Sequence, residues 1–204
     1  DTQLGNITAE GISLSVQGNI TQSDASSSIN SKSGLLTIGG AITFGGLNDV
    51  TLTNANNSIG AVSGTLAGNL ALNSSVNLEV SALQFGNASL TVSGNINGVQ
   101  AVSGNDLTVN TSTGGSVTMT NANTLTGTIS ANVAGGLTFN NTGNTSLGNI
   151  TAASAGINVG GIGTLSQVSG TTVAVTSGLD ITTANGAATL HQANSIDGTF
   201  TANV

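Results

Sequence analysis

Three ionisable side chains are candidates for a catalytic or metal-binding role: His191, Glu79 and Asp180. His191 is the single imidazole and follows the ATL segment at 188–190. A catalytic or metal-binding imidazole needs converging partners, and the sequence contains neither a second histidine nor a cysteine. A glycosidase-type reaction needs two carboxyl groups within roughly 10 Å of each other. Glu79 and Asp180 lie far apart in the sequence, so we expect no catalytic residue, no metal site, no cofactor and no enzymatic activity.

Other site chemistries meet similar obstacles. The string nearest to a calcium-binding GGxGxD motif is GGIGT at 160–164, and Thr164 and Leu165 stand where an acid is needed. The formal net charge is −7, and Lys32 is the only Lys or Arg. A chain with a single cation cannot neutralise a phosphate backbone, so nucleic acid is excluded as a partner. No apolar run reaches the ~20 residues of a membrane helix, so membrane insertion is not expected either.

Short strands are the elements that must carry every one of these residues. Apolar–x–apolar triplets recur throughout, such as LTI (36–38), LAL (70–72), LEV (78–80), LTF (137–139) and LDI (179–181). Alternation with a period of two is typical of a strand with one buried face, which places Glu79 and Asp180 on the outer face. Phe44, Phe139 and Phe200 occupy inward positions of the same pattern, with Phe85 less well defined. Thirty glycines and no proline favour strands and tight corners over helices.

The triplets repeat at intervals of about 20 residues, as at Leu70, Leu90, Leu137 and Ile157. We therefore predict an all-β fold: one continuous parallel β-helix, or β-solenoid, over residues 1–204, with about ten rungs of about 20 residues and no terminal caps. Longer phrases also recur. LGNITA occurs at 4–9 and 147–152, and residues 54–73 align with 121–140 without a gap. We divide the chain into internal blocks at roughly 1–73, 74–140 and 141–204.

The two ends of the sequence each resemble part of a repeat that continues in the middle of the chain. GTFTANV (198–204) resembles GTISANV (127–133), which continues in mid-chain, and DTQLGNITA at the start resembles NTSLGNITA at 144–152. Exposed strand edges are normally guarded by charge or bulges. Two explanations remain open: the chain is a piece of a longer array, or it is a subunit whose end rungs pair with those of its neighbours. In the second case we expect the end rungs to join head to tail, through residues near Leu4, Ile7 and Ile12 at one end and Ile196, Phe200 and Val204 at the other.

The GNITA, LTVSGNI and LTNAN phrases, set in Gly-, Ser-, Thr- and Asn-rich β repeats, resemble large secreted bacterial adhesins of the filamentous haemagglutinin type. They are also similar to autotransporter passenger repeats. The resemblance covers essentially the whole chain. It implies a right-handed parallel β-helix that acts outside the cell or on the bacterial surface. The Asn-Pro motifs of the family's secretion domain are missing, because the chain has no proline.

Two functions follow as expectations. The first is a structural extracellular subunit whose partner is itself, as a head-to-tail homopolymer forming a filament or surface fibre. The alternative is an adhesin stalk or binding segment of a larger secreted protein, with a host or matrix glycan or protein as its partner. Thr-x-Thr pairs such as Thr51/Thr53 fall too irregularly along the chain to favour an ice-binding face.

Overall fold

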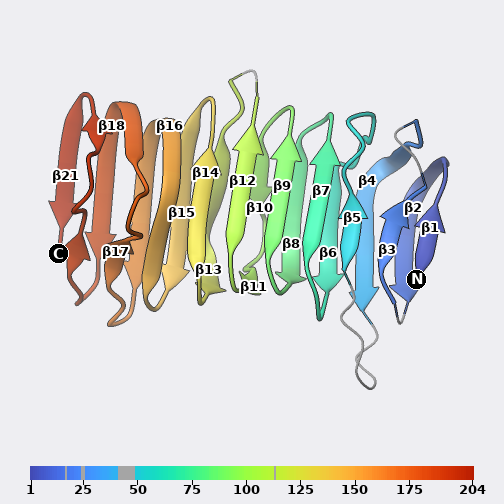
Figure 1. Cartoon of the computed structure of the whole chain (residues 1–204), viewed down its shortest axis with the longest axis horizontal. Helices are drawn as coiled ribbons and strands as arrows, with labels where there is room; N and C mark the ends of the chain where they lie inside the picture. The colour runs from blue at the N-terminus through green and yellow to red at the C-terminus, as the bar shows by residue number, and fades with distance from the viewer. Residues whose placement is uncertain (17, 24–25, 41–48, 113) are drawn as a thin grey trace.

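The structure is a computed structural model that describes residues 1–16, 18–23, 26–40, 49–112 and 114–204. For residues 9–16 and 31–40 only the backbone is described. Figure 1 shows strands stacked side by side along one long axis, with the two termini at opposite ends. The predicted fold class is confirmed: the chain is an all-β parallel solenoid with about 20 residues per turn.

One face of the solenoid is a ladder of parallel strands, in which each strand pairs with the next along the axis. Its members are β1 (Thr2–Leu4), β3 (Ile20–Gln22), β5 (Val50–Leu52), β7 (Leu70–Ser74), β9 (Ala88–Val92), β12 (Leu107–Thr111), β14 (Thr128–Asn132), the start of β16 (Thr145–Gly160), β17 (Leu165–Gln167) and β19 (Ala188–Thr189). We call this ladder the first face. Ten strands among the described residues mark ten rungs, and about nine complete turns connect the first to the last.

The opposite side is a second parallel ladder. It contains β2 (Ile7–Val16), β4 (Ile29–Gly40), β6 (Ala61–Thr65), β8 (Leu78–Gln84), β10 (Ile96–Gly98), β11 (Ser103–Gly104), β13 (Val117–Leu125), β15 (Gly136–Thr142), the end of β16, β18 (Val173–Thr183) and β21 (Thr199–Asn203). We call it the second face. A short strand, β20 (Ser195–Ile196), pairs with the first part of β18.

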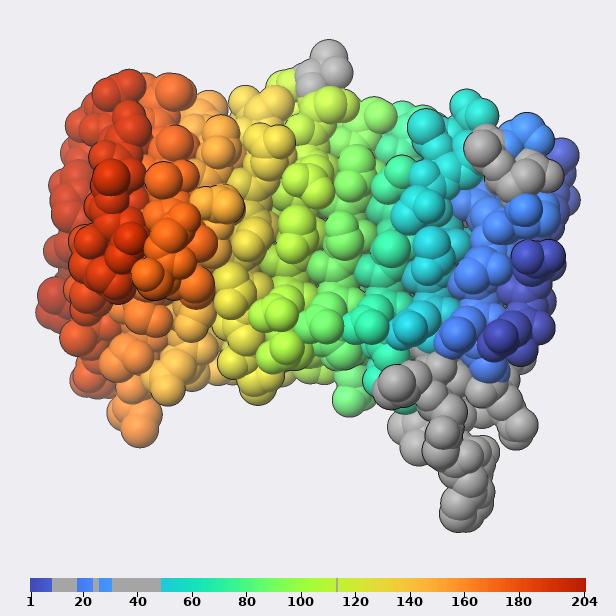
Figure 2. Space-filling view, viewed as in Figure 1, coloured from blue at the N-terminus to red at the C-terminus, as the bar shows by residue number. Residues whose placement is uncertain are grey.

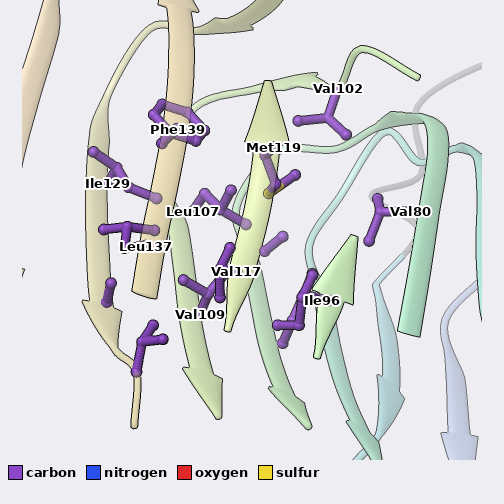
Figure 3. Packing of buried hydrophobic residues seen from close by; sticks show 14 of the residues in the cluster. Val80, Ile96, Val102, Leu107, Val109, Val117, Met119, Ile129, Leu137 and Phe139 are labelled. Carbon is purple, nitrogen blue, oxygen red and sulfur yellow. The ribbon is translucent and has the colours of Figure 1, made fainter. Parts of the chain in front are cut away.

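The core is the space between these ladders, filled by the inward residue of every alternating pair. Figure 3 shows this packing around Phe139, which is fully buried between Met119 and its neighbours. Inward residues form columns along the axis, because each strand pairs in register with the next. One column runs Val117, Leu137, Ala155, Leu179 and Phe200, and a parallel one runs Met119, Phe139, Ile157, Ile181 and Ala202.

Asparagine and aspartate side chains bind consecutive rungs together at the corner before the first face. The backbone N–H of Asn69 donates to Asp49 Oδ1 at 2.6 Å, and the N–H of Asn87 donates to Asn69 Oδ1 at 2.9 Å. The same pattern continues when Asp106 N–H donates to Asn87 Oδ1 at 3.2 Å. The recurring GN-apolar phrase of the sequence thus has a physical reason. Its amide satisfies a corner N–H that strand pairing leaves free.

Buried amide side chains also bind consecutive rungs together, through hydrogen bonds inside the corners. Asn123 is fully buried, yet its Oδ1 accepts from Val102 N–H at 2.9 Å, and its Nδ2 donates to the carbonyls of Met119 and Asn140 at 3.0 and 2.8 Å. A buried amide is tolerated only when it is hydrogen-bonded in this way. Each such corner therefore fixes how one rung sits on the next.

We predict that Asn123→Ala destabilises the protein by about 2–3 kcal/mol, because it leaves buried N–H and C=O groups without partners. The matched control is Asn132→Ala, since Asn132 is exposed on the next rung and its change should fall within about 0.5 kcal/mol. Chemical denaturation followed by circular dichroism measures both. Equal loss in the two variants would contradict the assigned role of Asn123.

A second prediction concerns Ala82, which adopts a left-handed φ of 47° in β8. The register of β8 against β6 shifts here, so Ala82 is the extra residue of a bulge. Ala82→Gly should stabilise the fold by about 0.5–1 kcal/mol, since glycine adopts this conformation without steric strain. Ala71→Gly, in the extended centre of β7, should instead destabilise it by a similar amount. Thermal unfolding of the pair gives the sign of each effect.

Candidate functional site: the end rungs

The tenth rung, residues 188–203, exposes one end of the apolar core to solvent. Phe200 is 53% exposed and Val204 is 69% exposed, whereas Leu179 and Ile181 directly beneath are each 1% exposed. Strand β21 pairs with β18 on one side, and none of the described residues pairs with its other edge. The exposure of Phe200 thus comes from its place at the end of a column.

These residues surround a hollow of about 380 Å³. Its apolar lining comes from three sides of the rung, through Ala188, Leu190, Ile196, Phe200 and Ala202, and from Ile181 of the ninth rung beneath. Val204 and the amide of Asn194 complete it, so no lining side chain is charged. The other large exposed apolar residues, such as Val99 and Ile162, are scattered along the sides. Among the side chains that the structure describes, exposed apolar groups gather around the end rung, which is the red end of the molecule in Figure 2.

The floor of the hollow is fixed by a reciprocal pair of amides. Gln167 Nε2 donates to Asn194 Oδ1 at 2.7 Å, and Asn194 Nδ2 donates to Gln167 Oε1 at 3.0 Å. Asn194 Oδ1 also accepts from the N–H of Val173 at 2.8 Å. Asn194 is therefore hydrogen-bonded downward, toward the ninth rung. Its Oδ1 and one of its two Nδ2 hydrogens are thus paired with groups of the ninth rung.

The same device occurs near the other end of the chain, in the third rung (residues 50–65). Gln22 Nε2 donates to Asn57 Oδ1 at 2.8 Å, and Asn57 Nδ2 returns a bond to Gln22 Oε1 at 2.9 Å. Asn57 Oδ1 accepts from the N–H of Ile29 at 2.9 Å, as Asn194 does from Val173. Sequence analysis missed both pairs. The spaced signals ITQ…NSI (20–22, 57–59) and LSQ…NSI (165–167, 194–196) could have revealed them.

The first three and last three rungs share one architecture. In both triplets the chain makes three sides per rung, with paired segments 2–4, 7–9 and 11–16 at the start and 145–147, 150–152 and 154–159 near the end. The repeated phrase LGNITA occupies the same place in both, from Leu4 to Ala9 and from Leu147 to Ala152. The first, second and third rungs therefore correspond to the eighth, ninth and tenth.

This correspondence supplies each end surface with an internal twin. The tenth rung matches the third, whose Val50, Leu52, Ile59 and Val62 are at most 1% exposed because the fourth rung covers them. The first rung matches the eighth, whose Leu147, Ile150, Ala155, Ile157 and Val159 are buried against the seventh and ninth rungs. Surfaces equivalent to both ends are thus already joined to other rungs inside the chain.

The predicted assembly residues occupy these two end rungs. Leu4 is buried at 9% exposure, and Ile7 is half-buried against the core. Ile12 lies in β2, but its side chain is outside the described ones. Ile196 is half-buried, and Phe200 and Val204 are exposed, all three around the same hollow. The structure thus brings the three carboxy-terminal residues together. Their role in assembly stays a prediction.

The three ionisable candidates lie apart from one another. Glu79 is exposed between buried Leu78 and Val80, as expected, and pairs in register with Ala61 and Asn97. Asp180 is exposed between Gly156 and Thr201.

His191 is an exposed residue of the tenth rung. No group of three or more His, Cys, Asp or Glu that could hold a metal ion occurs in the described ranges. Within the same ranges, no helix is long and apolar enough to cross a membrane.

The four phenylalanines divide by position. Phe139 and Phe85 are buried, in agreement with inward packing. Phe200 points into the same core but stands at its open end. Phe44 lies outside the described residues.

The first face carries a second surface feature. Its outward residues form a rank, that is, a straight row of small side chains in register along the axis. The row consists of Thr21, Thr51, Ala71, Ser89, Thr108 and Ser130. Three open hollows of about 560, 460 and 510 Å³ follow this rank. Hydroxyl, amide and carboxylate groups line them, including Asp49 and Asp106 in the second.

The fold and the end rungs together define a repeat protein of the parallel β-solenoid class. A family model described as "Repeats of unknown function (DUF5649)" matches residues 1–65, which are the first three rungs. No curated protein and no solved structure matches the chain.

A prediction tests whether the end surface is free in the isolated chain. At low protein concentration, Phe200→Ala should change the free energy of unfolding by less than about 1 kcal/mol, since the ring is half exposed. Leu179→Ala, one rung below in the same column, should cost about 2–5 kcal/mol. Denaturant titration of both variants gives the two values. A large loss for Phe200→Ala would mean that other atoms already cover the tenth rung.

Proposed function

We propose that this protein is a structural, non-enzymatic subunit that extends end to end with copies of itself into a filament or surface fibre. One observation carries the proposal: each end surface has a twin that is buried against another rung within the same chain. The proposal assigns the second copy the place that the fourth and seventh rungs occupy in those internal twins.

Two physical terms favour such a joint. The outer strands carry unpaired backbone N–H and C=O groups that a further strand satisfies, as in strand addition to an open sheet edge. The hollow of the tenth rung also removes apolar surface from water when it is covered. Opposing terms are small, because its lining has no charged side chain to desolvate and the whole chain contains few charges.

The geometry of the joint implies a filament and not a closed ring. Two different surfaces meet, and successive copies are related chiefly by translation along one axis, so the contact repeats without closing. Ten rungs at about 4.8 Å give an axial repeat of roughly 48 Å. The sequence repeats resemble those of filamentous-haemagglutinin-type adhesins and autotransporter passengers. This resemblance supports placing the filament outside the cell, on a bacterial surface.

A second function is favoured by the first face. The three hollows follow one another along a regular rank of hydroxyl and amide groups, a surface able to hydrogen-bond to a glycan or an extended protein segment. In that case the chain is a stalk or binding segment of an adhesin, and its partner is a host or matrix molecule. Binding would then occur on the side of the solenoid, independently of the end rungs.

The test of assembly is a comparison of three proteins under the electron microscope. The parent chain, concentrated stepwise, should form unbranched fibres with a repeat of roughly 48 Å. Phe200→Asp should raise the concentration needed for fibres by at least about tenfold, because the joint would bury an unpaired carboxylate. Ile162→Asp, which places the same charge on an 86% exposed residue at the side, should leave fibre formation unchanged.

Short monodisperse rods at every concentration would refute assembly. Rods that also bind glycans or cells would support the stalk function instead.

A further inference from the structure

The internal rungs also determine how two copies should meet, and this inference rests on the proposed end-to-end assembly. We propose that the first rung of a second copy seats on the tenth rung in the register used inside the chain. Gln3 then lies over Thr189, Leu4 over Leu190, and Ile7 over Asn194. The partner is thus a second copy of this chain, bound by its first rung and in one polarity.

The first side of the rung gives the register directly. Thr145, Leu165 and Ala188 form one column, and Ser146, Ser166 and Thr189 form the next. In the repeated phrase LGNITA, Leu4 corresponds to Leu147, so Gln3 corresponds to Ser146. Continuing the second column past Thr189 therefore places Gln3 in the following rung. Gln3 and Thr189 are both exposed, as outward positions of this column should be.

The second side leads to the same arrangement. Ile150 pairs with Val173, and the register of β18 with β20 continues that column to Asn194. Ile7 corresponds to Ile150 and so falls over Asn194. The amide of Asn194 is already hydrogen-bonded to Gln167 and to Val173 N–H, so its Oδ1 and one Nδ2 hydrogen are paired below the position that Ile7 would take.

The third side extends the two core columns that end at Phe200 and Ala202. In the eighth rung their positions are held by Ala155 and Ile157, to which the backbone positions of Ile12 and Leu14 correspond. A seated first rung therefore adds the next member to each column. The 380 Å³ hollow closes in the way that the fourth rung closes the third.

The alternative contact between two copies joins two tenth rungs. A two-fold axis across the solenoid would reverse the strands, so the end strands would pair antiparallel. The columns and the asparagine corners of this chain are built on parallel pairing at every described junction. An antiparallel joint would lose that in-register stacking, so we assign the first rung as the partner.

Disulfide trapping tests this register, and the absence of native cysteine makes it clean. The chain with both Gln3→Cys and Thr189→Cys should form covalent ladders of many subunits when fibres are oxidised with diamide. In-register parallel strands hold Cα atoms about 4.8 Å apart, within disulfide range. The control pairs Thr189→Cys with Gly5→Cys, two residues further along, where the Cα separation is about 8 Å and a bridge is disfavoured. Gly5 has open space for a side chain, so this variant should fold.

The outcomes separate the register from assembly itself. Ladders from the Gln3/Thr189 pair, at least about fivefold more abundant than from the Gly5/Thr189 pair, support the register. Fibres that form but cross-link mainly through Gly5 overturn it while leaving end-to-end assembly intact. Covalent dimers from Thr189→Cys alone identify tenth-to-tenth pairing and overturn the polarity. Soluble, uncross-linked monomers at every concentration overturn both the register and the proposed function.

Discussion

Parallel pairing of each rung with the next, at one fixed spacing, is the constraint from which the rest of this structure follows. Every side chain then has the same two axial neighbours at about 4.8 Å, one above and one below. A side chain must therefore fit the size and polarity of the two side chains stacked above and below it. The column Met119, Phe139, Ile157, Ile181 shows the result for apolar residues. The chain of bonds from Asp49 through Asn69 to Asn87 shows it for polar ones.

The same constraint explains why so little charge is present. Like charges stacked in a column would repel one another at each rung, whereas hydroxyl and amide groups can donate to one neighbour and accept from the other. The buried amides add selectivity. Gln22 with Asn57, and Gln167 with Asn194, hold particular rungs together, because each pair forms its reciprocal hydrogen bonds in one arrangement. An apolar core of near-identical rungs would by itself slip easily between registers.

The fold class was predictable from the sequence because period-two triplets and a 20-residue interval are local signals. Leu78, Glu79 and Val80 could be assigned inward, outward and inward from the alternation alone, and the structure agrees. The corners were less accessible. Asn123 reads as a polar residue between strands, and nothing nearby reveals that Val102 and Asn140, in neighbouring rungs, satisfy its amide. Contacts between rungs depend on the length of each turn, which varies along the chain.

Segments with similar sequences can lie on different faces of the solenoid, so a sequence alignment does not always match equivalent positions. The phrases at 54–73 and 121–140 match without a gap, yet the first places Ala61–Thr65 on the second face and the other places Thr128–Asn132 on the first face. Both faces demand the same alternation of small outward and apolar inward residues, so their sequences converge. The repetition with matching three-dimensional position is that of the first three rungs in the last three. It is marked by LGNITA and by the two amide pairs.

A stack of rungs has no internal reason to end. In a globular fold the last strand completes a closed core, but here the tenth rung leaves Phe200 with one covered face and one open face. The tenth rung repeats the third, including its amide pair, and the third is covered by the fourth. A surface that copies an interior junction retains the hydrogen-bonding edge and the apolar area of that junction, and the proposed joint with another parallel rung rests on these two features.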